Sequence, residues 1–508
     1  MDLFSNLMLG VDTALDPTTL LYCLIGVTLG TLIGVLPGIG ALATISLLLP
    51  ITYHIAPAPA LVMLAGVWYG AQYGGSIASI LLNLPGTPSS AVVCLDGYPM
   101  TKQGRAGVAL FVTTIASFVG SMIGIFILVM FTPAIAALAL RFGPAEYFAI
   151  MLLGLVAAST VAAGPPVKGL AMVVLGLLLG TVGTDVGSGV ARFHFGFPQL
   201  RDGITLVALA MGLFGIAEVV GSVNRKLGAE VRERITFRSM LPTRTDVRQS
   251  SMPMLRGSAV GSFIGALPGA GVAISAFMAY AVEKRIARDP SRFGKGAIEG
   301  ITGPEAANNA AAQTAFVPTL ALGIPGSATM GLMLGALIIH GIQPGPLFIS
   351  NQPELFWGLV VSFGVGNILL VILNLPLIGM WVALLRVPYK LLYPAIIIFI
   401  CIGVYSVRNN VFDIQLVAVI GILGYILVTF GFSAAPLLLG FVLGPLMEET
   451  LRRTLLLSRG DPTVFIERPI SAGFLAVTAA LLIWSAYSSY RMQRREKLAR
   501  ESGLKAPE

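Results

Sequence analysis

The chain has 508 residues, of which 56% are hydrophobic and only 11% are charged. Soluble domains carry about a quarter charged residues, so this composition, with a mean hydropathy of +0.87, excludes an ordinary soluble fold. The net charge of +8 does not indicate nucleic-acid binding, because the basic residues gather in loops beside apolar segments and accompany no nucleic-acid-binding motif.

Apolar segments long enough to cross a bilayer recur from near Leu20 to near Tyr487. Their pattern is not the alternation of a transmembrane barrel, so helices are expected. The sequence therefore predicts an all-α polytopic membrane protein with about 12 transmembrane helices.

In chain order, the apolar segments and the basic loops between them divide the sequence into six parts. Residues 1–19 lack the basic start of a signal peptide, so we expect the first membrane segment to remain in the mature protein. The parts are the lead-in 1–19, a first membrane repeat 20–222, a basic cytoplasmic linker 223–254, a second membrane repeat 255–453, a C-terminal loop with the last span 454–490, and a basic cytoplasmic tail 491–508.

The sequence TLIGVLPGIG at 31–40 occurs a second time as SFIGALPGAG at 262–271. Six residues from the Ile to the final Gly are identical at a displacement of 231 residues. A Pro-Gly step inside an apolar segment removes a backbone donor and loosens a helix. Each copy therefore predicts a helix break.

A second pair of motifs follows in the same order, LNLPGTPSSA at 82–91 and LGIPGSATMG at 322–331, displaced by 240 residues. Two matched breaks in each half indicate a duplicated membrane unit. Interrupted helices at matching positions are typical of transporters whose two halves have inverted topology, and whose site lies near the middle of the bilayer. We expect that arrangement here.

Small hydroxyl residues follow each second break, where a new helix would begin. These are N-cap residue types, and a helix N-terminus offers free N–H groups to an anion. The alternative is ordinary capping, with the hydroxyls turned onto their own backbone. The predicted substrate-binding residues at these breaks are Pro85, Gly86, Thr87, Pro88, Ser89, Ser90, Pro325, Gly326, Ser327, Ala328 and Thr329.

The first breaks would expose carbonyl groups, which suit a hard cation such as Na⁺. The predicted ion-binding residues are Pro37, Gly38, Ile39, Gly40, Pro268, Gly269, Ala270 and Gly271. The acids Asp96, Asp185, Glu218 and Glu305 lie near the ends of the expected spans and are interpreted as interfacial. Their scarcity favours Na⁺ over H⁺ as the coupling ion.

Polar side chains also occur within the segments that precede the second breaks. Asn308 and Asn309 could line the site, or could cap and hold helices together. The residues leave both interpretations open.

Signals for an enzyme are missing from the sequence. The three histidines and three cysteines are widely separated, and no P-loop is present. We therefore expect no catalytic residue and no cofactor.

Five stretches together resemble the TctA family, the large membrane subunits of the tripartite tricarboxylate transporters. They are GVLPGIG, YGGSIASILLNLPGTPSS, LDGYPM, GALPGAG and GPEAANNAAAQTAFVPTLALGIPGSATMGLMLGA, and the resemblance runs from about residue 20 to Arg453.

The resemblance implies a secondary uptake system of the bacterial inner membrane with an elevator-type movement. It also implies two partners, a small TctB-like membrane subunit and an extracytoplasmic TctC-like solute-binding protein. A cation gradient, commonly Na⁺, would drive import of a tricarboxylate, dicarboxylate or aromatic carboxylate. The alternatives are a scaffolding or channel-like subunit that transports nothing by itself, and an intramembrane enzyme.

Overall fold

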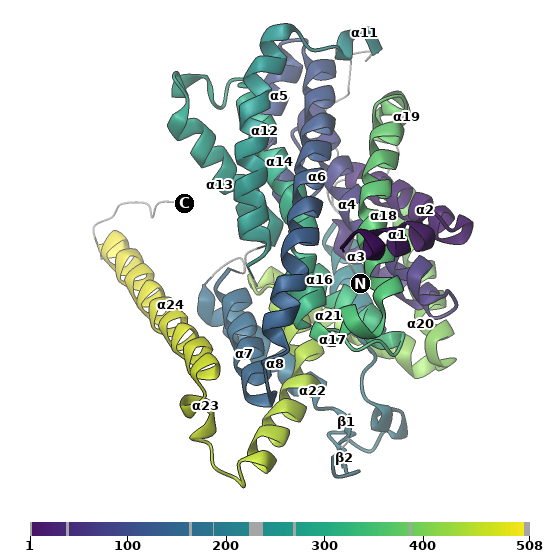
Figure 1. Ribbon diagram of the computed structural model, residues 1–508, viewed down its shortest axis with the longest axis vertical. Coiled ribbons are helices and arrows are strands. Elements are labelled where there is room, and N and C mark those ends of the chain that lie inside the picture. Colours follow the sequence, from purple (N-terminus) through teal and green to yellow (C-terminus); the bar gives the residue numbers. More distant parts are fainter. Residues whose placement is uncertain are drawn as a thin grey trace. The chain divides into compact units, whose positions relative to one another are not determined.

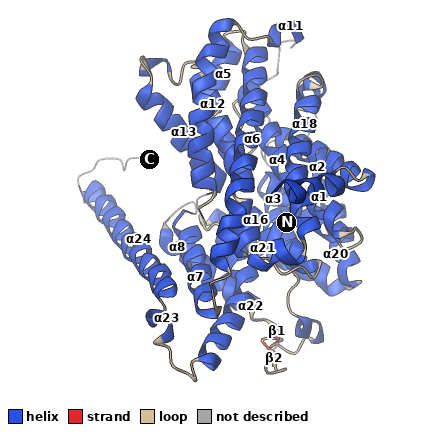
Figure 2. Ribbon diagram, viewed as in Figure 1, coloured by secondary structure: helices blue, strands red, loops and turns tan. Residues whose placement is uncertain are grey.

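The computed structural model describes residues 3–36, 40–161, 165–185, 187–222, 237–267, 271–385 and 389–501. Within these ranges the chain is almost entirely helical (Figure 2). The described strands form one short antiparallel hairpin, β1 (Gly183–Thr184) with β2 (Ala191–Arg192), in which Gly183 pairs with Arg192. The all-α prediction is confirmed for this part of the chain.

The chain forms two compact units, each made of two separate segments. The first comprises Met1–Leu140 and Leu206–Tyr425, and the second comprises Arg141–Thr205 and Ile426–Glu508. The first unit therefore contains the four Pro-Gly motifs of both predicted repeats.

The helices of the first unit follow one another along the chain, and most of the α-helices are labelled in Figure 1. They are α1 (Leu3–Ala14), α2 (Pro17–Val35), α3 (Gly40–Thr52), α4 (Pro57–Leu82), η1 (Pro88–Ala91), α5 (Cys94–Lys102), α6 (Ala106–Ala139), α9 (Leu206–Ala210), η3 (Met211–Ile216), α10 (Ala217–Ser222), α11 (Phe237–Met240), α12 (Arg244–Gly265), α13 (Gly271–Ile286), η4 (Pro290–Arg292), α14 (Glu299–Thr314), α15 (Phe316–Leu322), α16 (Ala328–Ile339), α17 (Pro346–Asn351), α18 (Pro353–Asn374), α19 (Ile378–Leu384), α20 (Tyr389–Arg408) and α21 (Val411–Thr429), the last of which runs past the end of the unit.

The second unit contains fewer helices and the β-hairpin. Its helices are α7 (Pro144–Val161), α8 (Pro166–Gly180), η2 (Pro198–Asp202), α22 (Ala434–Leu457), α23 (Val464–Glu467) and α24 (Pro469–Glu501).

Many helices begin where the sequence supplies a rigid first turn. Proline occupies the first position of α2, α4, α8, α17 and α18, where its missing N–H costs nothing. At α2, the Asp16 carboxylate also accepts hydrogen bonds from the amides of Thr18 and Thr19, at 3.0 and 3.1 Å. Local sequence therefore fixes these helix starts.

Six described helices are long and apolar enough to cross a membrane, which makes this a multi-pass membrane protein. They are α2, α6, α18, α21, α22 and the Pro469–Tyr487 part of α24. Further apolar helices, such as α3 and α16, are too short to span the bilayer alone. The count of about 12 spans stays a prediction.

Glycines bring α2 and α4 into backbone contact. A Cβ added to Gly30 would lie 2.5 Å from the carbonyl oxygen of Val67, which is closer than real side chains approach. Gly26 and Gly34, one turn to either side, meet the carbonyls of Met63 and Ala71 in the same way. Small residues at such an interface allow close packing inside a membrane, where no hydrophobic effect drives helices together.

The pair α12 and α14 makes the same contacts at positions displaced by the same 231 and 240 residues that relate the sequence motifs. The facing residues are Gly257 with Gly303, Gly261 with Ala307, and Gly265 with Ala311. The same pattern of backbone contact therefore occurs once beside each pair of motifs.

A charged contact joins the N-terminal ends of α6 and α12. The Arg105 guanidinium donates to the Asp246 carboxylate at 2.6 Å, and the Thr243 amide donates to the same carboxylate at 2.9 Å. Burial raises the pKa of Asp246, but these donors outweigh burial and hold that pKa below its usual range.

Replacing Gly261 with valine should destabilise the protein, because the added side chain would overlap the Ala307 carbonyl and force α12 away from α14. We expect a loss of about 1–3 kcal/mol, or failure to fold. Thermal unfolding in detergent measures the effect. The control is Gly364→Val in α18, where an added Cβ meets nothing within 4 Å. Equal destabilisation by both variants would contradict the packing argument.

The lowered pKa of Asp246 predicts an acid-side loss of stability. Its carboxylate stabilises the fold above the unfolded-state pKa of about 3.9, and this contribution is lost as pH falls through the lower folded-state pKa. The melting-temperature difference between wild type and Asp246→Asn should therefore shrink between about pH 6 and about pH 3. A constant difference across that range would show that Asp246 does not titrate as proposed.

Candidate functional site

Helix breaks occur at both second motifs. In the first half, α4 ends at Leu82 and Asn83 adopts a left-handed conformation, with φ of 57°. In the second half, α15 ends at Leu322 and Gly323 adopts the same conformation, with φ of 71°. The two left-handed residues are displaced by 240 residues, as the sequence motifs are.

The first motifs also separate two helices in each half. Here α3 begins at Gly40 and α13 begins at Gly271, with φ of 70° and 68°. Of the predicted ion-binding residues, the remaining six lie outside the described residues: Pro37, Gly38, Ile39, Pro268, Gly269 and Ala270. Residues 223–236 of the predicted linker lie outside them as well.

The structure brings the second break of the first half against the helices that precede it. The Gly86 amide donates to the Gly75 carbonyl at 3.4 Å, and a Cβ on Gly86 would lie 2.0 Å from the Gly34 carbonyl oxygen. Because Gly34 lies one turn before the first break, the two breaks of this half are neighbours.

The hydroxyls after the first-half break bond to the protein itself. Ser90 Oγ donates to the Thr87 carbonyl at 2.9 Å and accepts from the Thr87 amide at 3.1 Å. Ser89 Oγ donates to Gln72 Oε1 on α4 at 2.8 Å, and Thr87 Oγ1 lies 3.0 Å from Ser89 Oγ. Ser90 is thus an ordinary capping residue, whereas Ser89 points to α4. Pro85 and Pro88 are exposed.

The second-half break starts a longer helix. Ser327 Oγ accepts a hydrogen bond from the Met330 amide at 3.3 Å and caps α16. Pro325, Gly326, Ala328 and Thr329 are buried beside it. By contrast, the first-half break leads into the four-residue turn η1.

Each second break packs against the helix that follows the first break of the other half. The turn η1 contacts α13, and α16 contacts α3. All four motifs are therefore tied together by contacts between the halves.

Glu305 lies in the middle of α14 and is fully buried, so the interpretation of this acid as interfacial is wrong. Its carboxylate accepts hydrogen bonds from Ser76 Oγ on α4 at 2.7 Å, from Ser117 Oγ on α6 at 2.9 Å, and from Asn309 Nδ2 at 3.1 Å. The small residues around it allow α4, α6 and α14 to close over the carboxylate. The matched position of the first half, Ala65, carries no charge.

Asp96 also proves to be buried, but its role is to hold a loop. Asp96 Oδ1 accepts from the amides of Gly294, Gly296 and Ala297 at 2.8–2.9 Å. Tyr280 donates to the other oxygen at 3.0 Å. The LDGYPM segment thereby anchors the loop that leads into α14.

Several buried amide groups near Glu305 have no partner. Both amide atoms of Asn308 and of Gln313 lack a hydrogen bond, and so does Asn309 Oδ1. Buried polar groups are nearly always satisfied, and exceptions mark unmade contacts to water, an ion or a ligand. The α14 face with Glu305, Asn308, Asn309 and Gln313 is therefore the best candidate site among the described residues.

One turn of α4 connects this face to the first-half break. Gln72 accepts from Ser89, and Ser76, four residues later on the same helix face, donates to Glu305. The predicted substrate residues and Glu305 thus bond to adjacent positions of one helix.

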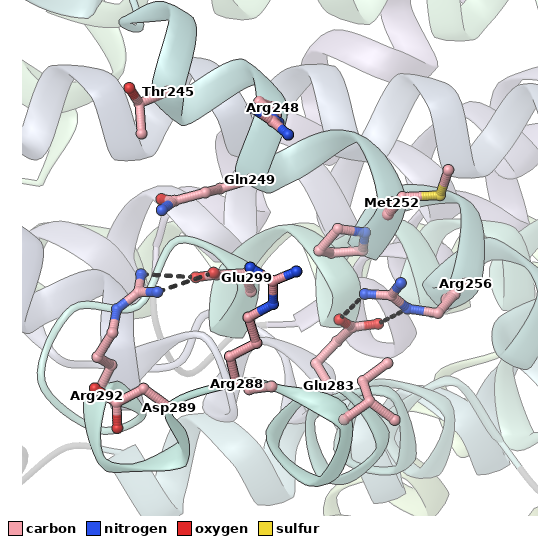
Figure 3. A pocket seen from close by; sticks show the side chains of 13 residues that line it. Thr245, Arg248, Gln249, Met252, Arg256, Glu283, Arg288, Asp289, Arg292 and Glu299 are labelled. Carbon is pink, nitrogen blue, oxygen red and sulfur yellow. Dashed lines mark hydrogen bonds and ion pairs between the residues drawn. The ribbon is translucent and has the colours of Figure 1, made fainter.

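A separate pocket of about 650 Å³ opens between α12, α13 and the loop around η4 (Figure 3). Two of its arginines are paired: Arg256 with Glu283 at 2.6 Å, and Arg292 with Glu299 at 3.0 Å. Arg248 and Arg288 complete the basic side chains of its lining. Because three carboxylates oppose four guanidinium groups, this pocket is nearly neutral and attracts an anion only weakly.

Comparison with known proteins places these motifs in a family. The model of the tripartite tricarboxylate transporter TctA family matches residues 20–439. The chain belongs to the TctA family. It is therefore the large subunit type of a tripartite tricarboxylate transporter, a transporter rather than an enzyme, and TctA proteins form part of a system with TctB and TctC partners.

Two relatives of this TctA chain come from Agrobacterium vitis. An uncharacterized 52.8 kDa protein in the TAR-I ttuC′ 3′ region is 49% identical over 501 residues, covering 99% of this chain and 100% of that protein. An uncharacterized protein in the TAR-II ttuC′ 3′ region is 55% identical over 234 residues, covering 46% of this chain and 97% of that protein. No solved structure matches the chain.

Sequence reasoning named Asn308 and Asn309 but missed Glu305 and its serine donors. A signal was present, since Glu305 is followed within ten residues by three buried amide side chains and no basic residue. Ser76 and Ser117 could not be found this way, because only the fold brings α4 and α6 to Glu305.

Asn308→Ala tests the candidate site directly. Because the Asn308 amide has no hydrogen bond to lose, the melting temperature should stay close to wild type. Substrate uptake should fall by about tenfold, which corresponds to loss of one ligand contact of about 1.4 kcal/mol. The control is Asn374→Ala in α18, a buried asparagine outside the cluster whose Nδ2 donates to the Leu370 carbonyl at 2.8 Å, and this variant should lower the melting temperature but leave uptake unchanged. Normal uptake by Asn308→Ala would remove this residue from the site.

Proposed function

We propose that this TctA chain is the permease subunit of a binding-protein-dependent secondary transporter that imports an organic carboxylate. The substrate class is a tricarboxylate, dicarboxylate or aromatic carboxylate, and the driving force is a cation gradient, of Na⁺ as the resemblance implies, with H⁺ as the alternative. The system would lie in the bacterial inner membrane, with a TctB-like small subunit and a TctC-like binding protein as partners.

The observation that carries this proposal is the set of unpartnered amides beside matched helix breaks in the buried part of a transporter family member. The side-chain amides of Asn308 and Gln313 can donate hydrogen bonds to a carboxylate, so no basic side chain is needed to bind the substrate. The backbone amides of Ala328 and Thr329, in the first turn of α16, have no partner within the helix and form the positive end of its dipole.

The two halves give this site a means of moving. The contacts of η1 with α13 and of α16 with α3 tie the break of each half to the other half. A rigid movement of this frame, of the elevator or rocking type, would expose the site to alternate sides of the membrane. The matched glycine contacts of α2 with α4 and of α12 with α14 would preserve the helix pairs during such a movement.

The alternative is a scaffold or channel-like subunit that carries no substrate itself. A scaffold gives no reason for amide groups buried without partners at the centre of the chain, since burying such groups is costly. In a transporter, the bound carboxylate would be the partner of these amide groups.

Uptake by reconstituted vesicles tests the function. Proteoliposomes holding this chain, its small subunit and its binding protein are given radiolabelled citrate, succinate or benzoate under an imposed Na⁺ or H⁺ gradient. We expect accumulation of one carboxylate class that requires one of the gradients. The control omits the binding protein.

Absence of uptake under both gradients, with all three components assembled and the carboxylate shown to bind its binding protein, would contradict the proposal and favour the scaffold. Uptake that only equilibrates the carboxylate would favour a channel-like subunit.

A further inference from the structure

We propose that Glu305 is the binding group for the coupling cation, a proton or Na⁺. This assignment rests on the proposed transport function and replaces no part of it. The carboxylate substrate would bind to the neighbouring side-chain amides, and the cation would bind to Glu305.

The surroundings of Glu305 differ from those of other buried acids in the described chain. Four of these acids contact an arginine within 2.7 Å, and a fifth, Asp96, is held by three backbone amides. The pairs are Asp246 with Arg105, Glu283 with Arg256, Asp185 with Arg452, and Glu146 with Arg468. The sixth, Asp413, interacts electrostatically with Arg408. Among the described residues, no basic side chain forms an ion pair with Glu305.

A buried carboxylate without a counter-ion is costly when it is charged. The hydroxyls of Ser76 and Ser117 and the amide of Asn309 offset part of this cost, but all three are neutral donors. A bound proton or Na⁺ neutralises the remaining charge. Ionisable groups buried among the helices of membrane proteins mark ion and proton pathways.

The ligand atoms around Glu305 suit either cation. The serine hydroxyls both donate and accept, so they can turn their lone pairs toward a cation bound at the carboxylate. Asn309 Oδ1 is buried without a partner and belongs to the same side chain that donates to Glu305. Two hydroxyls, a carboxylate and, once the Asn309 amide rotates to turn Oδ1 toward the carboxylate, an amide oxygen would provide hard oxygen ligands from three helices.

The site is connected to the substrate residues through α4. A cation bound at Glu305 would change the hydrogen bond that Ser76 donates to this carboxylate. A change at the first-half break would alter the hydrogen bond that Ser89 donates to Gln72. Because Gln72 and Ser76 are one helical turn apart, occupancy of either site changes the hydrogen bonding of the same turn. This gives a short physical route by which the cation and the carboxylate affect each other's binding.

The test separates transport from its coupling. Glu305→Gln keeps the size of the side chain and one acceptor oxygen, which can still accept from Ser117 and Asn309, while its Nε2 would donate to Ser76 instead of accepting from it. The amide neither takes up a proton nor attracts Na⁺ as a carboxylate does. In the complete reconstituted system, we expect gradient-driven accumulation to fall by at least about tenfold. Exchange of internal for external substrate, measured without any gradient, should stay within about threefold of wild type, because it needs no net movement of the cation.

Two controls accompany this variant. Glu299→Gln changes another glutamate of α14, one that pairs with Arg292 and lies away from the cluster, and it should leave accumulation intact. Glu305→Asp keeps the charge and should retain part of the accumulation. Wild type identifies the ion: dependence on the Na⁺ gradient assigns Na⁺, and dependence on the pH gradient assigns a proton.

Accumulation by Glu305→Gln at the wild-type level would overturn the inference while leaving the transport function standing. Lack of accumulation by wild type would instead refute the transport function. If Glu305→Gln does not insert into the membrane, the variants Ser76→Ala and Ser117→Ala test the assignment of Glu305 instead. Each should shift the cation concentration for half-maximal uptake by at least about threefold, and an unchanged value in both would overturn the assignment.

Discussion

Close contact between helix backbones is the constraint on which this structure depends. Inside a membrane, apolar side chains gain little by leaving lipid for protein, so helices associate through tight packing and shared polar contacts. The glycines of α2 and α12 allow that packing, since a side chain at Gly30 or Gly261 would overlap a carbonyl of the facing helix. The same packing reaches the site, because Gly86 lies against the Gly34 carbonyl of the first pair, and α4 and α14, one helix from each pair, both contribute to the enclosure of Glu305.

The enclosure of Glu305 shows how packing and chemistry are linked. Three helices converge on the carboxylate because Gly120 of α6 also lies against the Ala306 carbonyl, which brings Ser117 within reach of the acid. Water is thereby excluded, and each polar group near the carboxylate gains importance because nothing else can satisfy it. The amides left without partners beside it are thus the plainest physical sign of a missing ligand.

Much of the fold could be predicted from the sequence. The all-α class, the membrane location and the helix breaks are local properties, visible in hydropathy and in Pro-Gly steps. The displacements of 231 and 240 residues could also be read from the motifs, and the glycine contacts follow the same displacements.

The candidate site could be predicted only in part. Asn308 and Asn309 were visible as polar residues in an apolar stretch, but position along a segment does not reveal depth, so Glu305 was misjudged. The segment from Glu299 begins with charged and small residues, which makes it look like a span end, although every residue from Gly300 to Thr314 is buried. The hydroxyls at Ser90 and Ser327 were identified as N-cap types from local chemistry, whereas the bond from Ser89 to Gln72 depends on how the chain folds back on α4.

The matched helix pairs have a consequence for the chemistry of their other faces. Because the contacts use backbone and glycine, they place no demand on the side chains of the remaining faces. Where α14 carries Glu305, Asn308, Asn309 and Gln313, the equivalent positions of α4 carry Ala65, Trp68, Tyr69 and Tyr73. Helices with the same backbone contacts thus carry different chemistry: α14 supplies the acid and the amides, whereas α4 supplies aromatic rings at the positions equivalent to the amides and reaches Glu305 through Ser76.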